Sequence, residues 1–483
     1  MLKKSKNKKN NLAILGGKPV RRKPFFVEPL ISNEEKKLLI KAFNKKNFSR
    51  YIGSNSEDLK EILISKSTKK IKDSNQFHYL GGPNVRKFSY DVAKKFNVKY
   101  VIPTNSATSA ISICVGAAGL EPGDEIIVPA ISYTATATAI LMFGCIPVFV
   151  DICKDTFCLD TKKIEKKITS KTKAIMPVHL VGNLANMKEI FKIASKYGLK
   201  VIEDAAQAPG AKYYGKFAGT LGLAGILSLQ QSKNIMTGEG GLILTNDKKL
   251  AKRARLLINH GEVFFDKTSS KNELINMVGM NLRMTELSAA LGIAQLKKLD
   301  KVNRIRTKNA YYLSKNLKDI RGVDVQIIQN EINKNIKNIP HIFVMKFDEK
   351  KFGLSRDFFI SALRSEGIPV GTGYVRPMYM NPMFLKKIAY GGKGWPWNCI
   401  CKKRTAISKI KYFEGMCPVS ENLLNKEFLW FYHIAHSSTL KDMKDIIYSI
   451  KKIISNKSEL FKINKNIIKN LSAKGPQRDK VSR

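Results

Sequence analysis

Short apolar runs alternate with helical patterns between about residue 95 and residue 300. The runs read KYVIPT, DEIIVPA, IPVFVDI, KAIMPVHL, KVIEDAA, GILSLQ and GLILTN. Between them, segments such as ANMKEIFKIASKYG carry apolar residues at helical spacing. Strands that alternate with helices form a mainly parallel sheet covered on both faces. The pattern therefore predicts one large α/β domain.

A second, smaller domain is predicted after this region. The segment 283–317 has helical periodicity over a long span and would carry the chain out of the large domain. HIFVMKF, RDFFISALRSEGI and LKDMKDIIYSIKKIISN then indicate an α+β domain. We expect an N-terminal segment and large domain over 12–300, a Lys- and Ser-rich insertion near 54–75, a small domain over 301–456, and basic tails at 1–11 and 457–483.

The stretch 126–150 carries no charge for 25 residues, which is long enough for a membrane span. Pro129, Pro147 and Gly144 divide it into strand, helix and strand, so a buried β-α-β unit and a soluble protein are expected. The apolar piece LAILGG is too short for the core of a signal peptide. Seven cysteines without zinc-type spacing indicate reduced thiols in a cytoplasm, and no metal is expected.

The chain has a formal net charge of +46, which raises the question of nucleic acid or an anionic membrane as a partner. Its lysines are dispersed along the chain, and only the two ends hold dense basic runs. No nucleic-acid-binding motif is recognisable. We therefore expect no nucleic acid and no membrane as partners, and we attribute the charge to a Lys-, Asn- and Ile-rich composition.

One lysine stands out among the many. Lys233 lies in SLQQSKNIMTGEGG, between the apolar runs AGILSLQ and GLILTN, and so on a Gly-containing connection between two buried strands. Lysine is rarely buried without a partner. Lys233 is thus either a member of an ion pair or a covalent nucleophile.

Three other segments carry compatible chemistry. Ala107 and Thr108 open a helix directly after a strand, and a helix N-terminus binds phosphate. Asp204 ends an apolar strand, where it could pair with a protonated ring nitrogen or cap a helix. Tyr133 follows another strand end, where it could cover a planar ring or pack in the core, and Ser228 precedes the lysine by five residues. Phosphate seat, acid, aromatic face and lysine together indicate pyridoxal 5'-phosphate (PLP), held by the lysine as a Schiff base.

The sequence resembles the DegT/DnrJ/StrS family of PLP-dependent sugar aminotransferases. The likeness runs from LAILGGKPVR to LKDMKDIIYSIKKI. Its landmarks are GDEIIVPAISYTATATAI, PVFVDI, KAIMPVHLVGNLANM, IEDAAQAPGA, SLQQSKNIMTGEGG, GMNLRMTELSAALGIAQL and CPVSENLL. The resemblance implies a fold-type I α/β transferase with a large domain and a smaller C-terminal one.

The resemblance also implies roles for individual residues. Lys233 would bind the cofactor aldehyde, Asp204 the pyridine nitrogen, and Gln207 would lie beside the ring or its 3'-oxygen. Phosphate contacts would come from Ser228 and from the backbone at Ala107 and Thr108, and Tyr133 would stack on the ring. Asn281 matches a residue that reaches the phosphate of the neighbouring subunit, which implies a homodimer with shared sites. His179 and Tyr374 are candidates near the substrate.

The activity implied is transfer of an amino group from glutamate or glutamine to a keto sugar, most often nucleotide-linked, in polysaccharide or secondary metabolite biosynthesis. Arg376, beside Tyr374, would attract the diphosphate of such a substrate, or else it is a solvated loop arginine. The pair Gln230-Gln231 before the lysine departs from the pattern of many sugar aminotransferases and keeps a cyclitol ketone such as scyllo-inosose open as the acceptor. A second departure, Ala107 in place of the usual glycine of the phosphate seat, bears on the phosphate contact. A sugar dehydratase of this family would carry histidine at the position of Lys233.

Overall fold

The computed structural model describes residues 11–26, 28–49, 80–261, 277–325, 335–398 and 409–460, with the backbone of two short strands at 76–77 and 264–265. These two strands, β1 (Gln76–Phe77) and β11 (Phe264–Phe265), pair antiparallel. The predicted insertion near 54–75 lies outside the described residues, as do nearly all residues of the two predicted tails.

The central element is a seven-stranded sheet in the order β2-β10-β9-β6-β5-β3-β4. Only β10 runs antiparallel to its neighbours, so the predicted mainly parallel sheet is confirmed. Each apolar run of the sequence supplies one strand. The strands are β2 (Tyr100–Thr104), β3 (Glu125–Pro129), β4 (Ile146–Val150), β5 (Thr172–Ile175), β6 (Lys200–Asp204), β9 (Ala224–Ser228) and β10 (Gly241–Thr245).

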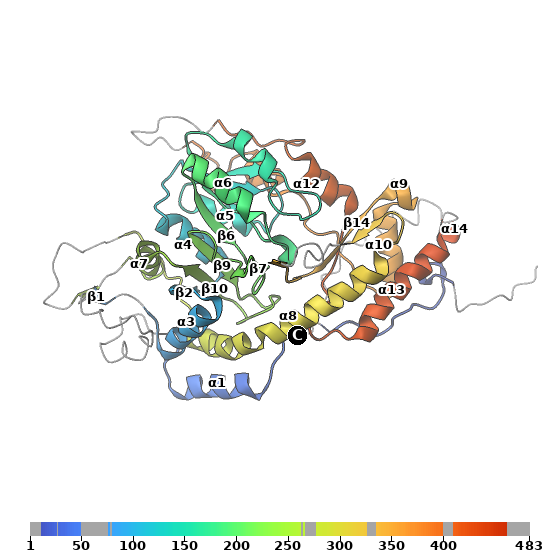
Figure 1. The fold of residues 1–483 in the computed structure, drawn as a ribbon, viewed down its shortest axis with the longest axis horizontal. Coiled ribbons are helices and arrows are strands. Elements are labelled where there is room, and N and C mark those ends of the chain that lie inside the picture. Colours follow the sequence, from blue (N-terminus) through green and yellow to red (C-terminus); the bar gives the residue numbers. More distant parts are fainter. Residues whose placement is uncertain are drawn as a thin grey trace, which may run out of the picture.

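Helices cover both faces of this sheet (Figure 1). Alternate strand residues face opposite sides: Ile126 and Val128 pack with α4 (Ala107–Ala117), α5 (Ala135–Leu141) and α7 (Lys248–Leu257), whereas Ile127 packs with α6 (Met187–Tyr197). On that second face α3 (Pro83–Phe96) covers the β2 edge. The uncharged stretch 126–150 is thus β3, α5 and β4, as predicted. Among the described residues, no helix is both long and apolar enough to cross a membrane.

The long helix α8 (Glu286–Leu317) joins two cores. Its first half packs with α3 and the sheet, and its second half packs with the C-terminal elements. Figure 1 shows α8 in yellow, passing from α1 (Asn33–Asn44) and α3 at one end to α10 (Arg356–Ser365) and α13 (Leu440–Ser455) at the other. The predicted helical connection is therefore present.

A three-stranded antiparallel sheet forms the centre of the C-terminal part, in the order β12-β14-β15. Its strands are β12 (Val323–Val325), β14 (Phe343–Phe347) and β15 (Phe428–Phe431), and the main helices beside it are α10 (Arg356–Ser365) and α13 (Leu440–Ser455). Shorter helices are α9 (Glu349–Phe352), α11 (Pro382–Leu385), α12 (Pro418–Asn422) and α14 (Lys457–Leu460). A second small sheet has the order β13 (Ile336–Lys337), β7 (Lys212–Tyr213), β8 (Lys216–Phe217), with β7 in the centre.

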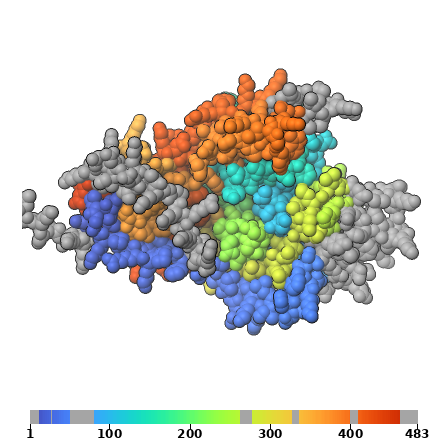
Figure 2. All heavy atoms as spheres, turned by 180° about the vertical axis from the view of Figure 1, so that it is seen from behind, coloured from blue at the N-terminus to red at the C-terminus, as the bar shows by residue number. Residues whose placement is uncertain are grey.

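Two segments pack away from their neighbours in sequence. Met378, Phe384 and Trp397, which follow the C-terminal sheet's second strand, are buried in the core of the seven-stranded sheet. Figure 2 shows this orange part of the chain lying over the teal part of the large domain. Conversely, Leu12 is buried among the C-terminal elements, and α1 (Asn33–Asn44) packs on α8. The predicted domain boundaries at residues 12, 300 and 456 therefore stay a prediction. Segments on each side of these boundaries pack into the core on the other side.

Candidate active site

Lys233 lies on the connection between β9 and β10, as predicted. Backbone hydrogen bonds fold this loop tightly, with Gln231 N donating to Gly238 O at 2.8 Å and Lys233 N to Gln230 O at 2.9 Å. The lysine side chain is half-buried. Burial lowers the pKa of Lys233 to about 8. The charge of Asp204 opposes this shift, whereas the charge of Arg306 adds to it. A free amine is therefore accessible close to neutral pH.

Asp204 ends β6, the strand beside β9, and its carboxylate is buried. Thr136 of α5 donates to Oδ2 at 2.7 Å, and Ala206 N donates to Oδ1 at 3.1 Å. Burial raises the pKa of Asp204, and the two hydrogen bonds and the charge of Lys233 oppose that rise. Residues 205–211, all of them described, form no helix, so Asp204 is not a helix N-cap. The sequence did not single out Thr136, whose only signal is its place three residues after Tyr133.

The predicted phosphate seat is the N-terminus of α4, which begins at Ala107 with Ser106 as N-cap. Amides in the first turn of a helix have no intrahelical acceptor. Ser228 pairs with Gly241 across β9 and β10. A Cβ on Gly241 would lie 2.6 Å from Ala107 N and 2.4 Å from Ser106 O, so this glycine permits the close approach of the two segments. Ser228 and the start of α4 therefore lie next to each other, one on each side of Gly241.

The predicted aromatic and amide residues lie around the same strand ends. Tyr133 is 67% exposed, which excludes core packing. Gln207 is buried, with Oε1 accepting from Val181 N at 2.9 Å and Nε2 donating to the hydroxyl of Tyr374 at 2.9 Å. Burial raises the pKa of Tyr374, and its hydrogen bond with Gln207 opposes this rise. Electrostatic interactions with Tyr432, Asp204 and Tyr133 raise the pKa further. Tyr374 is therefore close to Asp204 and to Tyr133.

His179 lies beside the end of β6, where its backbone N donates to Asp204 O at 3.0 Å. Its side chain is fully buried, with Nε2 3.0 Å from a carboxylate oxygen of Glu203, and Ala185 N donates to Nδ1 at 3.1 Å. The backbone donor makes Nδ1 the acceptor, so Nε2 carries the hydrogen and donates it to Glu203. Both ring nitrogens are therefore engaged. His179 thus holds the segment after β5 in place, and its place near the substrate stays a prediction.

The remaining two candidates lie on the surface of the single chain. Asn281 is exposed and forms an isolated β-bridge with Asn259. Arg376 is exposed in a loop whose end is anchored on the large sheet, where Met378 N donates to Ala130 O at 2.8 Å. The loop of Arg376 therefore crosses the end of β3, close in sequence to Tyr133. The structure leaves both side chains open to a ligand or to a second subunit.

A group of buried polar residues behind Lys233 was not foreseen from the sequence. It comprises Asn234, Asn303, Arg306 and His341. Two of these come from α8, where polar residues recur at helical spacing within an otherwise apolar face. That recurrence was the available signal, but a polar residue in a long helix is more commonly solvent-exposed.

Comparisons with known proteins show which family the chain belongs to. Residues 60–397 match the model of the DegT/DnrJ/EryC1/StrS aminotransferase family. The chain is 33% identical over 330 residues to the spore coat polysaccharide biosynthesis protein SpsC of Bacillus subtilis, covering 67% of this chain and 84% of that protein. It is 43% identical over 221 residues to the GDP-perosamine synthase of Caulobacter vibrioides, covering 45% and 58%.

Two further likenesses extend over most of the chain. A protein of Streptoalloteichus tenebrarius named for L-glutamine:3-amino-2,3-dideoxy-scyllo-inosose aminotransferase activity is 28% identical over 457 residues, covering 92% of this chain and 98% of that protein. The solved aminotransferase of Psychrobacter cryohalolentis has a TM-score of 0.74 at 24% identity, over 90% of this chain and 99% of that one, which shows a common fold. The family match, the relatives and the fold agree, and the chain belongs to the DegT/DnrJ/EryC1/StrS aminotransferase family.

Proposed function

We propose that this chain transfers an amino group from glutamate or glutamine to the ketone of a sugar, and that the sugar is linked to a nucleotide. As a member of its family the chain is a PLP-dependent aminotransferase. The observation that carries the proposal is the placement of Lys233 and Asp204 at neighbouring strand ends, each within reach of the other's charge. Such a pair matches a cofactor that needs an amine at one point and an acid at another.

Three features of the site fit PLP. The carboxylate of Asp204 is buried and hydrogen-bonded on both oxygens, yet each oxygen can accept a further hydrogen bond from a ring N–H. The start of α4 and Ser228 converge at Gly241, where a Cβ would clash with the backbone of Ser106 and Ala107, and the backbone amides at the start of α4 favour a phosphate. Tyr133 offers an exposed aromatic face. Bound PLP would supply an aldehyde that carries the amino group and a ring that stores the electron pair of the broken C–H bond.

In this proposal the chain's own residues move the protons. The amine of Lys233, with its pKa lowered to about 8, would act as the base that takes the proton from the α-carbon of the donor. The same amine would act as the acid that later delivers a proton to the carbon of the acceptor. The buried carboxylate of Asp204 would hold a proton on the ring nitrogen, and Thr136 would keep that carboxylate ionised. Gln207 and Tyr374, which are hydrogen-bonded to each other, would border the acceptor.

The direct test separates the two halves of the reaction. The purified enzyme, loaded with PLP, should lose its visible absorbance when glutamine or glutamate is added alone, and regain it when the keto sugar follows. Mass spectrometry should then detect the amino sugar. Lys233→Ala should abolish the lysine-bound absorbance and the product together. Normal turnover in that variant would contradict the proposal.

A cyclitol ketone is the second candidate acceptor. Its support is the cyclitol aminotransferase of Streptoalloteichus tenebrarius, whose likeness covers almost the full length of both chains. The nucleotide-linked alternative is supported by the GDP-perosamine synthase, which has the higher identity over a shorter segment. The two acceptors differ in charge, because a nucleotide sugar carries a diphosphate and a cyclitol ketone carries none.

Arg376 distinguishes these acceptors. For a nucleotide sugar, Arg376→Ala should raise KM roughly tenfold with kcat little changed, since a charge-assisted hydrogen bond is lost in ground and transition states alike. Raising the salt concentration should raise KM of the wild type in the same direction. Arg304→Ala, which removes an exposed arginine from α8, is the matched control and should leave KM unchanged. An unchanged KM in Arg376→Ala, together with turnover of scyllo-inosose, would favour the cyclitol.

A further inference from the structure

The residue after Lys233 is tied to α8 by a pair of buried amides. Asn234 Nδ2 donates to Asn303 Oδ1 at 2.9 Å, and Asn303 Nδ2 donates to Pro209 O at 2.8 Å. Pro209 follows the segment of Asp204 and Gln207 in the chain. Asn303 therefore links the loop of the lysine to the loop that follows the acid.

Arg306 lies one turn further along the same face of α8. It is buried, with 5% of its surface exposed, and Nη1 donates to His341 O at 2.7 Å. His341 Nδ1 lies 3.4 Å from Asn234 Oδ1, which closes the group around the residue next to Lys233. The Nε of Arg306 is buried without a hydrogen-bond partner among the described residues. Burying a guanidinium whose Nε has no such partner costs solvation free energy. We therefore ask which neighbouring group its positive charge affects.

The charges that face Lys233 come from two elements. Asp204 of β6 attracts the lysine cation, and Arg306 of α8 repels it. His341, in front of β14, adds no positive charge, because burial and the charges of Lys233 and Arg306 lower its pKa well below the usual value. Arg306 is thus the cation that offsets Asp204.

We propose that Asn303 and Arg306, on one buried face of α8, are positioning residues for Lys233. Asn303 holds the lysine's backbone through Asn234, and the buried guanidinium of Arg306 opposes a positive charge on the amine. This inference rests on the proposed function, in which the uncharged amine of Lys233 adds to the PLP aldehyde, a C=N bond forms and water leaves. A merely structural Arg306 would support the carbonyl of His341 and would leave the charge state of Lys233 alone.

The test is capture of PLP by the cofactor-free full-length protein. The rate at which visible absorbance appears is measured from pH 6 to pH 10 for the wild type and for Arg306→Gln, which keeps a donor for His341 O and loses the charge. Without that charge the lysine cation is favoured, so the pKa of Lys233 rises. The pH midpoint of the rate should therefore move upward by about 0.5–1 unit.

Two other variants complete the design. Asn303→Ala should slow capture about tenfold at every pH, with an unchanged midpoint, because it affects position and no charge. Arg253→Gln is the matched control: Arg253 also donates to backbone carbonyls, those of Gly116 and Ala117, but between α7 and α4. Its midpoint and rate should equal those of the wild type. Circular dichroism and melting temperature are recorded for every variant.

The outcomes are distinguishable. A wild type that captures no PLP would contradict the proposed function itself. A wild type that captures PLP, with the same midpoint in Arg306→Gln, would overturn the role of Arg306. Wild-type rates in Asn303→Ala would overturn the role of Asn303, and this variant alone decides the inference if Arg306→Gln does not fold.

Discussion

At the scale of single residues, the environment of Asp204 depends on a side chain from another element. Thr136 Oγ1 lies 2.7 Å from the carboxylate and 2.8 Å from the hydroxyl of Ser132, so it is part of a short buried hydroxyl chain. Burial by itself favours the protonated acid. The hydroxyl of Thr136 opposes this effect of burial and favours the ionised carboxylate, which is the form that the proposed pairing with a pyridinium requires.

Thr136→Val should make this dependence measurable. Loss of a hydrogen bond to an ionised group costs about 1.5–3 kcal/mol, which would raise the pKa of Asp204 further, by about one unit or more. Because a raised carboxyl pKa leaves more of the protonated acid at a given pH, the acid limb of kcat should move to higher pH. Asp204→Asn should retain PLP but lose most activity at every pH.

Thr138→Val is the control for this prediction. Thr138 lies on the same helix, and its hydroxyl donates only to Thr134 O, away from any carboxylate. Its pH profile should match that of the wild type. An acid limb that stays in place in Thr136→Val would show that the hydroxyl does not tune Asp204.

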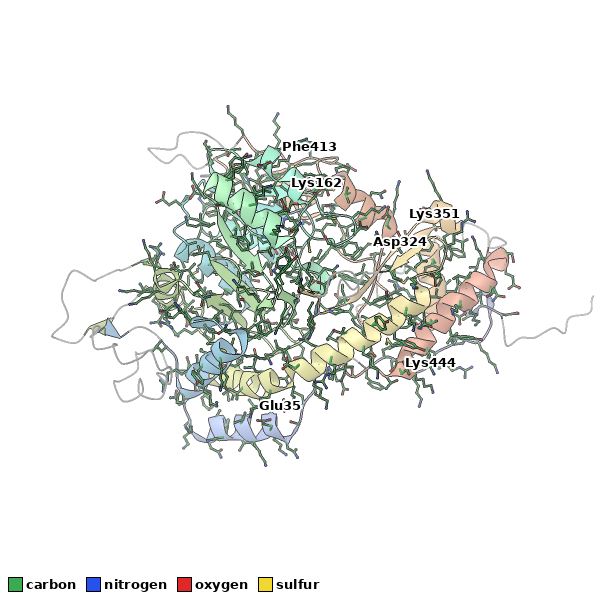
Figure 3. The ribbon with its side chains drawn as sticks, in the orientation of Figure 1. Glu35, Lys162, Asp324, Lys351, Phe413 and Lys444 are labelled. Atoms are coloured by element: carbon green, nitrogen blue, oxygen red, sulfur yellow. The ribbon has the colours of Figure 1, made fainter. Side chains whose placement is uncertain are left out.

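At the scale of elements, α1 is held on α8 by one buried acid (Figure 3). Glu35 accepts hydrogen bonds from both polar groups of Ser32, from Gln295 Nε2 at 2.7 Å and from Lys298. Burial would raise the pKa of Glu35, but Lys298 and Ser32 outweigh it and lower the value to about 2. The capping box of α1 and the contact between the helices thus share one carboxylate.

The lowered pKa predicts how the attachment of α1 responds to acid. A carboxyl whose pKa is lower in the folded state stabilises that state above its unfolded pKa, and this is lost as pH falls from about 4.5 towards 2. Glu35→Gln should therefore reduce the free energy of unfolding by about 1–2 kcal/mol at pH 7, and the difference should shrink below pH 4.5. Hydrogen exchange of α1 would report the local effect.

Glu34→Gln is the matched control in the same turn. Glu34 pairs with Lys297 at the surface, and both side chains are substantially exposed. Exposed pairs contribute 0–1 kcal/mol, so this variant should change stability by a few tenths of a kcal/mol. Equal effects of the two substitutions would show that the buried position of Glu35 carries no special stability.

At the scale of the whole molecule, the position of Asn281 bears on assembly. It is exposed on the single chain, whereas the family resemblance implies that it reaches the phosphate of a neighbouring subunit. A shared site needs both subunits in closed symmetry. We predict a homodimer, with a mass in solution close to twice the 54.3 kDa of the chain.

Mixing two defective variants tests whether the sites are shared. Lys233→Ala and Asn281→Ala should each have little activity, but heterodimers made by unfolding and refolding them together contain one site with both natural residues. Random pairing would place about a quarter of all sites in that state, so activity should return towards a quarter of the wild type. No recovery, with a dimeric mass, would place Asn281 at its own subunit's site or outside the site.

The sequence by itself determined the parts of this protein that follow from local periodicity and from the direction of strands. The strands of the sheet could be predicted because short apolar runs flanked by turns have few alternative structures. Lys233 and Asp204 could be associated because they follow strands of a largely parallel sheet, whose carboxyl ends share one edge. The start of α4 could be located because a small-residue cluster follows a strand.

Only the tertiary structure decided which distant side chains meet. Thr136 reaches Asp204 from a helix 68 residues earlier, and Asn303 reaches Asn234 from one 69 residues later. The ring of His179 lies between Glu203 and a backbone amide, a pairing that the sequence did not indicate. Such contacts depend on how whole elements pack, and many packings satisfy the same periodicity. The requirement that buried polar groups be paired operates only once that packing exists.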